Sequence, residues 1–406
     1  MTPGPDENDG EAEPWPVAII VGTRPEALKL APLIRALKER PRRFAPLVIA
    51  TGQHREMLDQ VLSLFQITPD VDLDLMRPNQ TLKRITADVV QTMGETLAHL
   101  RPRLVIVQGD TTTAFASALA AFYGRIPVAH VEAGLRSGDP ANPFPEEINR
   151  RLTAVLTDLH FAPTPLARRR LRREGVPVRK IAVTGNTIID TLNALLTRDL
   201  AGSRPRPGPI DLALDGRRLL VVTSHRRESW GHELESICHA IRELVTRFAD
   251  LVVVYPVHLN PNVRDTVHRV LRDVERVHLI PPLDYAAFVR LMREAYLILT
   301  DSGGIQEEGP TLRKPLLVLR KVTERPEAFR AGLAKLVGTD RASIVAAVSR
   351  LLTDGVAYRD MTADANPYGD GHAADRIVEA LSRWFRGRRP LLPRAREFQP
   401  PTFVPS

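Results

Sequence analysis

The stretch TDSGGIQEE occupies residues 300–308 and directly follows the apolar run from Tyr296 to Leu299. An apolar strand that ends in a small, glycine-bearing turn and opens a helix presents unpaired backbone N–H groups to an anion. The turn therefore predicts a phosphate seat, unless its glycines serve only the backbone freedom of an ordinary strand-to-helix connection. Glu308 follows about one helical turn later, where its carboxylate could accept hydrogen bonds from the two hydroxyls of a ribose. The stretch thus favours a nucleoside diphosphate as ligand.

Apolar runs of this kind alternate with amphipathic, helix-like stretches along the chain. Continuous Val, Ile and Leu runs separated by helices are typical of parallel sheets that are covered on both faces. The pattern predicts two Rossmann-like, doubly wound α/β domains that face each other across a cleft. Ligands of such sheets bind beyond the carboxyl ends of the strands. The predicted strands lie at residues 17–21, 47–50, 104–107, 128–131, 219–223, 251–255, 277–280, 297–300 and 316–319.

The division between the two domains is predicted at the segment GSRPRPGP, residues 202–209, because dense Pro and Gly resist helix and strand and suit a linker. The predicted segments are a disordered acidic tail at 1–14, an N-terminal α/β domain at 15–201, the linker at 202–216, a second α/β domain at 217–365, a C-terminal helix at 366–386 and a basic Pro/Arg-rich tail at 387–406. The two tails are either disordered or bind a partner.

Composition limits the class of protein. The 406 residues, 43% of them hydrophobic, can bury a large core, but the longest apolar runs fall far short of the roughly 20 residues that span a bilayer, so no membrane insertion is predicted. The acidic N-terminus is unlike a signal peptide, and the single cysteine, Cys238, fits a reducing cytoplasm. The net charge is +8, but no aromatic residues are interleaved in the basic clusters. This favours solvated basic faces or a small anionic substrate over nucleic acid.

The first predicted strand is followed by Gly22-Thr23-Arg24-Pro25-Glu26 and by a helix that we expect to begin near Ala27 and to include Lys29. Proline costs little in the first turn of a helix, where its missing N–H would be unpaired in any case. Arg24 would project into the cleft, and its guanidinium suits a two-point contact with phosphate oxygens. The alternative is an exposed arginine at an ordinary helix start.

Two carboxylates follow predicted strands of the first domain, and a third begins a predicted helix. Asp110 is either a cap of the next helix or a catalytic acid. Glu132 follows a strand end, where a buried carboxylate is costly unless paired or functional, so we favour catalysis there. His130 shares a face with Glu132 if the strand continues that far. Glu146 begins a predicted helix, where acids also suit the helix dipole, so the catalytic and structural interpretations are equal.

In the second domain, His225 follows the first strand, in the position that Arg24 has in the first domain. It could bind or protonate a phosphate, although a lone histidine at a turn is otherwise unremarkable. Arg325 follows a later strand and faces phosphate if the alternation holds. The segment GDGHAA at 369–374 matches a dinucleotide fingerprint by its letters, but no strand precedes it. With no Walker loop, zinc-ligand cysteine pair or HExxH motif in the sequence, no cofactor and no metal is predicted.

The motifs together resemble the non-hydrolysing UDP-N-acetylglucosamine 2-epimerases of bacteria over about Val17 to Leu381. The resemblance implies a glycosyltransferase-B-like fold with UDP in the second domain, interconversion of UDP-GlcNAc and UDP-ManNAc, and usually a cytoplasmic homodimer whose C-terminal helix packs back on the first domain. The strings that carry it are GTRPEALKLAPL, TGQHREMLDQVL, GDTTTAFASALAAFY, HVEAGLRSGD, FPEEINRRL, VTGNTIIDTL, SHRRESWG, VYPVHLNPNVR, LTDSGGIQEEGP, TERPEA and NPYGDG.

Site residues follow from the resemblance position by position. The catalytic candidates are Asp110, Glu132 and Glu146, with His225 on the phosphate side. The substrate-binding candidates include Lys29 and three of the catalytic candidates, Asp110, Glu132 and His225. The others are Arg24, Leu283, Phe288, Ser302, Gly303, Gly304, Glu308 and Arg325. Leu283 and Phe288 would lie near uracil, and Leu283 stands where some relatives have Gln. A second, activating UDP-GlcNAc site would include Gln53, His54, Arg226 and His258, although the arginine-rich patch there differs from that of the relatives.

The chemistry implied is elimination of UDP to a 2-acetamidoglucal intermediate, followed by re-addition of UDP after protonation of C2 on the opposite face. Three alternatives are a UDP-sugar-dependent glycosyltransferase, a hydrolysing epimerase and a catalytically silent UDP-sugar sensor. The three carboxylates argue against the transferase. The downstream use of the product, in teichoic acid, capsule or antibiotic sugar assembly, does not follow from the sequence.

Overall fold

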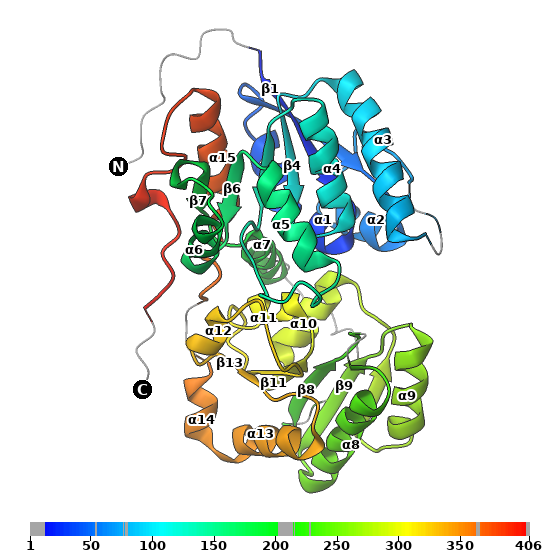
Figure 1. Cartoon of the computed structure of the whole chain (residues 1–406). Helices are drawn as coiled ribbons and strands as arrows, with labels where there is room; N and C mark the ends of the chain where they lie inside the picture. Colours follow the sequence, from blue (N-terminus) through cyan, green and yellow to red (C-terminus); the bar gives the residue numbers. More distant parts are fainter. Residues whose placement is uncertain are drawn as a thin grey trace. The chain divides into compact units, whose positions relative to one another are not determined.

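The computed structural model describes residues 13–52, 55–75, 77, 80–201, 214, 216–226, 229–362 and 366–402. Contacts divide the chain into two compact units (Figure 1). The first unit comprises Met1–Thr187 with His372–Phe398, and the second comprises Ile188–Gly371 with Gln399–Ser406. Most of the predicted acidic tail at 1–14 and of the predicted linker at 202–216 lies outside the described residues.

The first unit is built on a seven-stranded sheet in the order β3-β2-β1-β4-β5-β6-β7, with every adjacent pair parallel. The order reverses at the boundary between β1 and β4, which is where ligands of doubly wound sheets bind. Its strands are β1 (Trp15–Val21), β2 (Phe44–Ala50), β3 (Val71–Asp72), β4 (Leu104–Gln108), β5 (Val128–Val131), β6 (Leu159–Ala162) and β7 (Ile181–Val183).

Helices connect these strands. They are α1 (Arg24–Lys38), α2 (Arg55–Leu64), α3 (Leu82–Leu100), α4 (Thr112–Tyr123), α5 (Glu146–Leu156) and α6 (Pro165–Arg173), with the short 3-10 helix η1 (Val178–Lys180) before β7. Figure 1 shows α3, α4 and α5 side by side, and α4 contacts both neighbours. The alanines of α4 are buried, because small side chains let a helix between two others approach them closely.

The second unit has a six-stranded sheet in the order β10-β9-β8-β11-β12-β13, again parallel throughout and reversing at its central pair, β8 and β11. The predicted fold class, two Rossmann-like parallel-sheet domains, is therefore confirmed. The strands are β8 (Arg218–Thr223), β9 (Leu251–Pro256), β10 (Val277–Ile280), β11 (Leu297–Thr300), β12 (Leu316–Val318) and β13 (Ala334–Leu336).

The helices of this part of the chain are α7 (Thr187–Ala201), α8 (His232–Arg247), α9 (Pro261–Leu271), α10 (Tyr285–Glu294), α11 (Gly303–Glu308), α12 (Glu327–Arg330), α13 (Arg341–Thr353) and α14 (Gly355–Asp360). A hydrophobic core forms between the sheet and helices such as α8 and α13. Cys238 on α8 is fully buried in this core, which raises the pKa of its thiol to about 12. No helix in the described ranges is long and apolar enough to cross a membrane.

The C-terminal segment packs within the first unit. Helix α15 (Ala373–Phe385) places Phe385 in a stacked contact with Trp15, with ring centroids 4.6 Å apart. The following residues include the 3-10 helix η3 (Arg394–Arg396), and the buried Phe398 donates its backbone N–H to the carbonyl of Val183 at 2.9 Å. The predicted Pro/Arg-rich tail at 387–406 is thus attached to the edge of the first sheet as far as residue 398.

Candidate active site

The turn after β1 is fixed by a capping box. Thr23 is the N-cap of α1, which begins at Arg24 rather than near Ala27, so the predicted helix start was three residues late. The buried Glu26 accepts the backbone N–H groups of Gly22 at 2.8 Å and Thr23 at 2.5 Å. Its other oxygen accepts the Thr111 hydroxyl at 2.6 Å, which ties this turn to the one after β4. Burial raises the pKa of Glu26, although these hydrogen bonds oppose the rise.

Glu132 has an unusual backbone for a residue with a side chain. Strand β5 ends at Val131, and Glu132 has a φ of 67°, in the left-handed region. The strand therefore does not continue as far as Glu132, and the condition under which His130 and Glu132 would share a face is not met. Residues other than glycine occupy this region at a cost and are concentrated at functional sites. The outlier points to Glu132 as a functional residue.

Three polar side chains surround the Glu132 carboxylate, which is only 8% exposed. Lys29 of α1 donates to Oε1 at 2.6 Å, and Asn186 donates to the same oxygen at 3.3 Å. Gln108, at the end of β4, donates to Oε2. A buried carboxylate is tolerated when it is paired and hydrogen-bonded in this way. Sequence analysis missed Gln108 and Asn186 as partners.

His130 contacts the backbone. Its Nε2 lies 2.7 Å from the carbonyl oxygen of Gly109, and burial lowers the pKa of the ring to about 4. The neighbouring strand pairs it with His160, whose pKa burial lowers to about 3. Both rings are therefore neutral at neutral pH, and we assign them to the core of the sheet.

Asp110 is not the cap of α4. Thr111 has that role, because its hydroxyl accepts the N–H of Ala114 at 3.0 Å. The Asp110 carboxylate instead contacts Arg150 of α5 at 2.5 Å, and its side chain remains 26% exposed. Asn149, also of α5, donates to the Asp110 carbonyl oxygen at 3.0 Å. The predicted acid is thus accessible and held by a neighbouring helix.

Arg24 and Glu146 are the first residues of α1 and α5, and both are half-buried. The buried arginine partner of α5, Arg150, also contacts Glu147 at 3.1 Å. Of the predicted site residues of the first unit, Lys29 and Glu132 are in direct contact. The catalytic role of Glu146 stays a prediction.

The central carboxylate of the second unit is Asp301, directly after β11. It is fully buried, and Oδ2 accepts the hydroxyl of Ser224 at 3.1 Å and the backbone N–H groups of His225 at 2.7 Å and Arg226 at 2.9 Å. Nδ1 of His225 lies 3.1 Å from Oδ1. Burial alone would raise the pKa of Asp301, but its bonds with His225 and Arg226 outweigh burial and lower it. Sequence analysis assigned no role to Asp301.

This arrangement orients His225 at the switch point of the second sheet. Its ring stacks on His258 with centroids 5.8 Å apart, and Arg226 donates through Nε to the Asp301 carbonyl oxygen at 3.0 Å. Burial and the nearby His225 lower the pKa of His258. Gln53 and His54 lie outside the described residues. The second UDP-GlcNAc site, predicted from Gln53, His54, Arg226 and His258, stays a prediction.

The Ser-Gly-Gly turn opens α11, with Ser302 as N-cap and Gly303 and Gly304 as the first helical residues. A Cβ atom at Gly303 would lie 2.9 Å from Nη1 of Arg325, so a larger residue here would displace that guanidinium. Arg325 is held by Glu307 through Nε at 2.6 Å and by Glu324 through Nη1. Two predicted site residues, Gly303 and Arg325, thus meet at one turn.

Glu308, the last residue of α11, is buried and accepts the hydroxyl of Tyr285 at 2.6 Å. Tyr285 begins α10, which is capped by the side chain of Asp284. Leu283 immediately precedes this cap and Phe288 lies on α10, and both are half-buried. The contact with Tyr285 places Glu308 beside the start of α10. Of the two predicted uracil-side residues, Leu283 precedes this helix and Phe288 lies on it.

The strand orders and the residues beyond the strand ends define a class. In both sheets the strand order reverses at a central pair of strands. Polar side chains gather after those strands, as in nucleotide-binding doubly wound sheets. Structural neighbours at TM-scores of 0.87 and 0.78 place the chain among glycosyltransferase-B-like proteins. A family model described as UDP-N-acetylglucosamine 2-epimerase matches residues 35–382. The chain belongs to this family, which confirms the predicted family and the predicted kind of enzyme.

Individual relatives agree with this assignment. Proteins named UDP-N-acetylglucosamine 2-epimerase from Escherichia coli O157:H7 and Yersinia pestis are each 52% identical to the chain, and each match covers 90% of the chain and 98% of the relative. The Neisseria meningitidis enzyme, solved with UDP-GlcNAc bound, is 46% identical at a TM-score of 0.87, covering 90% of this chain and 99% of that one. The Methanocaldococcus jannaschii enzyme, solved with UDP-GlcNAc and UDP, is 33% identical at 0.78, with coverage of 90% and 99%.

Proposed function

We propose that this protein interconverts UDP-N-acetylglucosamine and UDP-N-acetylmannosamine by inversion at C2. The observation that supports this most directly is the buried pair of Lys29 and Glu132, 2.6 Å apart beyond the central strands of the first sheet. The backbone of Glu132 is left-handed, a conformation concentrated at functional sites, and its carboxylate is held by a lysine, so we infer a role in proton transfer. The family membership and the UDP-GlcNAc bound to the Neisseria relative agree with this substrate.

The reaction requires UDP to leave first. The C2 proton is not adjacent to a carbonyl carbon, so a carboxylate could hardly remove it from the ground state. When the C1–O bond breaks, UDP departs with the electron pair, and the developing cation at C1 makes the C2 proton acidic. A base then takes this proton, and the C2–H electron pair forms the C1–C2 double bond of 2-acetamidoglucal.

The second half returns the groups with opposite stereochemistry. An acid delivers a proton to the other face of C2, and a phosphate oxygen of UDP forms a new bond to C1. Two groups are needed because the proton leaves from one face and returns to the other. We propose that Asp110, Glu132 and Glu146 supply these functions.

The leaving group needs its own contacts. We propose that Arg24, His225, Arg325 and the turn at Ser302, Gly303 and Gly304 bind the pyrophosphate, because guanidinium and backbone N–H donors stabilise negative charge as it develops. Asp301 orients His225 for this role through the contact at 3.1 Å. Glu308 would bind the ribose hydroxyls, with Leu283 and Phe288 beside uracil.

Incubation with UDP-GlcNAc alone in deuterated water tests the function. We expect deuterium at C2 of both UDP-GlcNAc and UDP-ManNAc, observed by proton NMR and mass spectrometry, because each elimination exchanges the abstracted proton. A glycosyltransferase without acceptor would leave C2 unlabelled. A hydrolysing epimerase would release UDP and free ManNAc, and either result would contradict the proposal.

We also propose that the protein is a homodimer that uses an apolar face of α4 and α5. Ile148, Leu152 and Val155 occur at helical spacing on α5, and Val155 is 83% exposed. At the end of the adjacent α4, Phe122 and Tyr123 are 56% and 68% exposed. A stripe of exposed apolar side chains on packed helices is typical of a protein interface.

Aspartate substitutions test the dimer. The Leu152→Asp/Val155→Asp variant should elute as a monomer in size-exclusion chromatography with light scattering, because two buried carboxylates would be unpaired at the interface. The matched control is Val356→Asp on α14, where the side chain is 58% exposed in the second unit. This control should keep the dimer. A double variant that still forms the dimer would exclude this face.

A further inference from the structure

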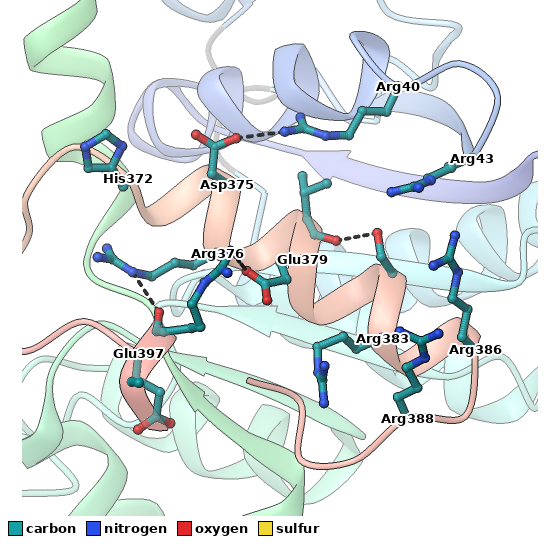
Figure 2. Close-up of a pocket in the computed structure, with 14 residues that line it drawn as sticks. Arg40, Arg43, His372, Asp375, Arg376, Glu379, Arg383, Arg386, Arg388 and Glu397 are labelled. Carbon is teal, nitrogen blue, oxygen red and sulfur yellow. Dashed lines mark hydrogen bonds and ion pairs between the residues drawn. The ribbon is translucent and has the colours of Figure 1, made fainter. Parts of the chain in front are cut away.

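A cavity of about 860 Å³ lies within the first unit, apart from every residue assigned to the proposed active site. Figure 2 shows that its walls come from α15, from the segment after α1 and from the C-terminal tail. These walls are strongly basic. The cavity is lined by the seven arginines Arg40, Arg43, Arg376, Arg383, Arg386, Arg388 and Arg396, together with His372, Asp375, Val378, Glu379, Ser382, Ala395 and Glu397. We call it the arginine pocket.

The arginine pocket has a defined frame. Arg40 pairs with Asp375 at 3.0 Å, which joins the segment after α1 to α15, and Arg396 pairs with Glu379 at 2.8 Å, which joins the tail to α15. Arg383 donates to the carbonyl oxygen of Pro390 at 3.1 Å. Segments that are distant in sequence are therefore held around one concave surface.

Positive charge exceeds negative charge in this pocket. Seven guanidinium groups face three carboxylates, a surplus of four positive charges with His372 counted as neutral. One of the carboxylates, Glu397, contacts Arg168 at 2.6 Å and accepts the N–H of Val183 at 3.2 Å, both outside the pocket lining. Like charges confined to a concave surface repel one another and raise the local concentration of anions.

We propose that the arginine pocket binds an oligophosphate, meaning a chain of at least two phosphoryl groups. Arginine presents a planar fork of donors that suits phosphate oxygens in two-point contacts. Arg43, Arg386 and Arg388 lie at one end of the pocket and His372 at the other, so N–H donors extend along it (Figure 2). A single small anion would meet only part of this set.

The lining also indicates which part of a ligand is recognised. Among the described residues that line it, Val378 and Ala395 are the only apolar ones, and none is Phe, Tyr or Trp. Bases are usually held by stacking on aromatic rings, so the pocket is suited to the phosphate chain and not to a nucleobase. The volume lies within the range of about 300–1,000 Å³ that is usual for small-molecule sites.

The pocket depends on the part of the chain outside the family match. The family model covers residues 35–382, whereas Arg386, Arg388 and Arg396 lie beyond it. The proposal does not depend on the epimerase reaction.

Isothermal titration calorimetry of the full chain with sodium tripolyphosphate tests the proposal, at physiological salt and with saturating uridine 5′-monophosphate, which has only one phosphoryl group, to occupy the proposed active site. We expect one tripolyphosphate per chain. The Arg386→Gln/Arg388→Gln variant should bind at least about tenfold more weakly, equivalent to about 1.4 kcal/mol. The same variant should keep the wild-type rate of C2 deuterium exchange. ATP, which has the same phosphate chain, should bind about as tightly as tripolyphosphate.

The matched control is Arg350→Gln/Arg359→Gln in the second unit, which removes two arginines outside the pocket lining. It should leave tripolyphosphate affinity unchanged. Absence of binding to the full chain, equal weakening in both double variants, or binding restricted to ATP would each overturn the proposal. If the pocket variant has a lowered melting temperature, the single Arg388→Gln change at an exposed side chain provides the same comparison.

Discussion

Glu132→Gln should slow C2 deuterium exchange by about a hundred- to ten-thousandfold, the range that a positioned acid or base contributes. Glutamine keeps the size of the side chain but cannot accept a proton from C2. It also places an amide beside the donors of Lys29, Gln108 and Asn186, which now bond the carboxylate. The measurement is exchange at saturating UDP-GlcNAc, which separates kcat from KM.

A purely structural role for Glu132 would give a different pattern. Loss of the carboxylate leaves Lys29 buried with an altered partner, which lowers stability, so the melting temperature must be measured with the rate. UDP affinity, which we attribute mainly to residues of the second unit, should change less than twofold. The control is Glu174→Gln, which removes another carboxylate from an arginine pair, 2.7 Å from Arg136, and should keep full activity. Wild-type exchange in Glu132→Gln would remove Glu132 from the mechanism.

The sequence predicted strands from largely apolar runs of four or five residues. The run at 104–107 became β4, and the runs at 128–131, 277–280 and 297–300 became β5, β10 and β11 within the predicted bounds. The missed strands are β3, β6, β7 and β13, which have two to four residues each. β3, β7 and β13 have two or three residues each, too few for a period or a long apolar run, and hydrogen bonding to a neighbouring strand identifies them. β6 has the same length as the predicted strands β5 and β10 and, like them, includes one histidine, so the sequence could have identified it.

The chemistry of the site was partly visible in the sequence. Asp110 and Glu132 were found because they follow predicted strands, and the letters TRPE at 23–26 contain a capping-box signal that could have identified Glu26. The left-handed backbone of Glu132 and its contact with Lys29, 103 residues away, could not be derived. They depend on the packing of α1 against the sheet, which no local pattern specifies.

The buried histidines should make the first unit sensitive to acid. The pKa of His130 is about 4 in the folded protein against 6.5 for an exposed ring, because burial disfavours the charged form. The unfolded chain therefore binds a proton below pH 6.5 that the folded chain does not bind until about pH 4. Stability is present above pH 6.5 and is lost as the pH falls through this window. Between pH 7.5 and 5.0 this loss amounts to about 2 kcal/mol for His130 alone.

The His130→Asn variant isolates this contribution. Asparagine does not titrate, although its shorter side chain loses the bond that Nε2 makes with the Gly109 carbonyl, so the fall in unfolding free energy between pH 7.5 and 5.0 should be smaller by about 2 kcal/mol than in the parent. Denaturant unfolding can be followed in a Trp230→Phe background, because the other tryptophans, Trp15 and Trp384, belong to the first unit.

His99→Asn, at an exposed position near the end of α3 in the same unit, is the control and should keep the parental pH dependence. His160 also contributes, since burial lowers its pKa to about 3, and it faces His130 across the strand pair. Because protonation of one ring disfavours protonation of the other, the two contributions are not additive. An unchanged pH dependence in His130→Asn would mean that His130 takes up its proton in the folded state, and that burial does not keep the ring neutral.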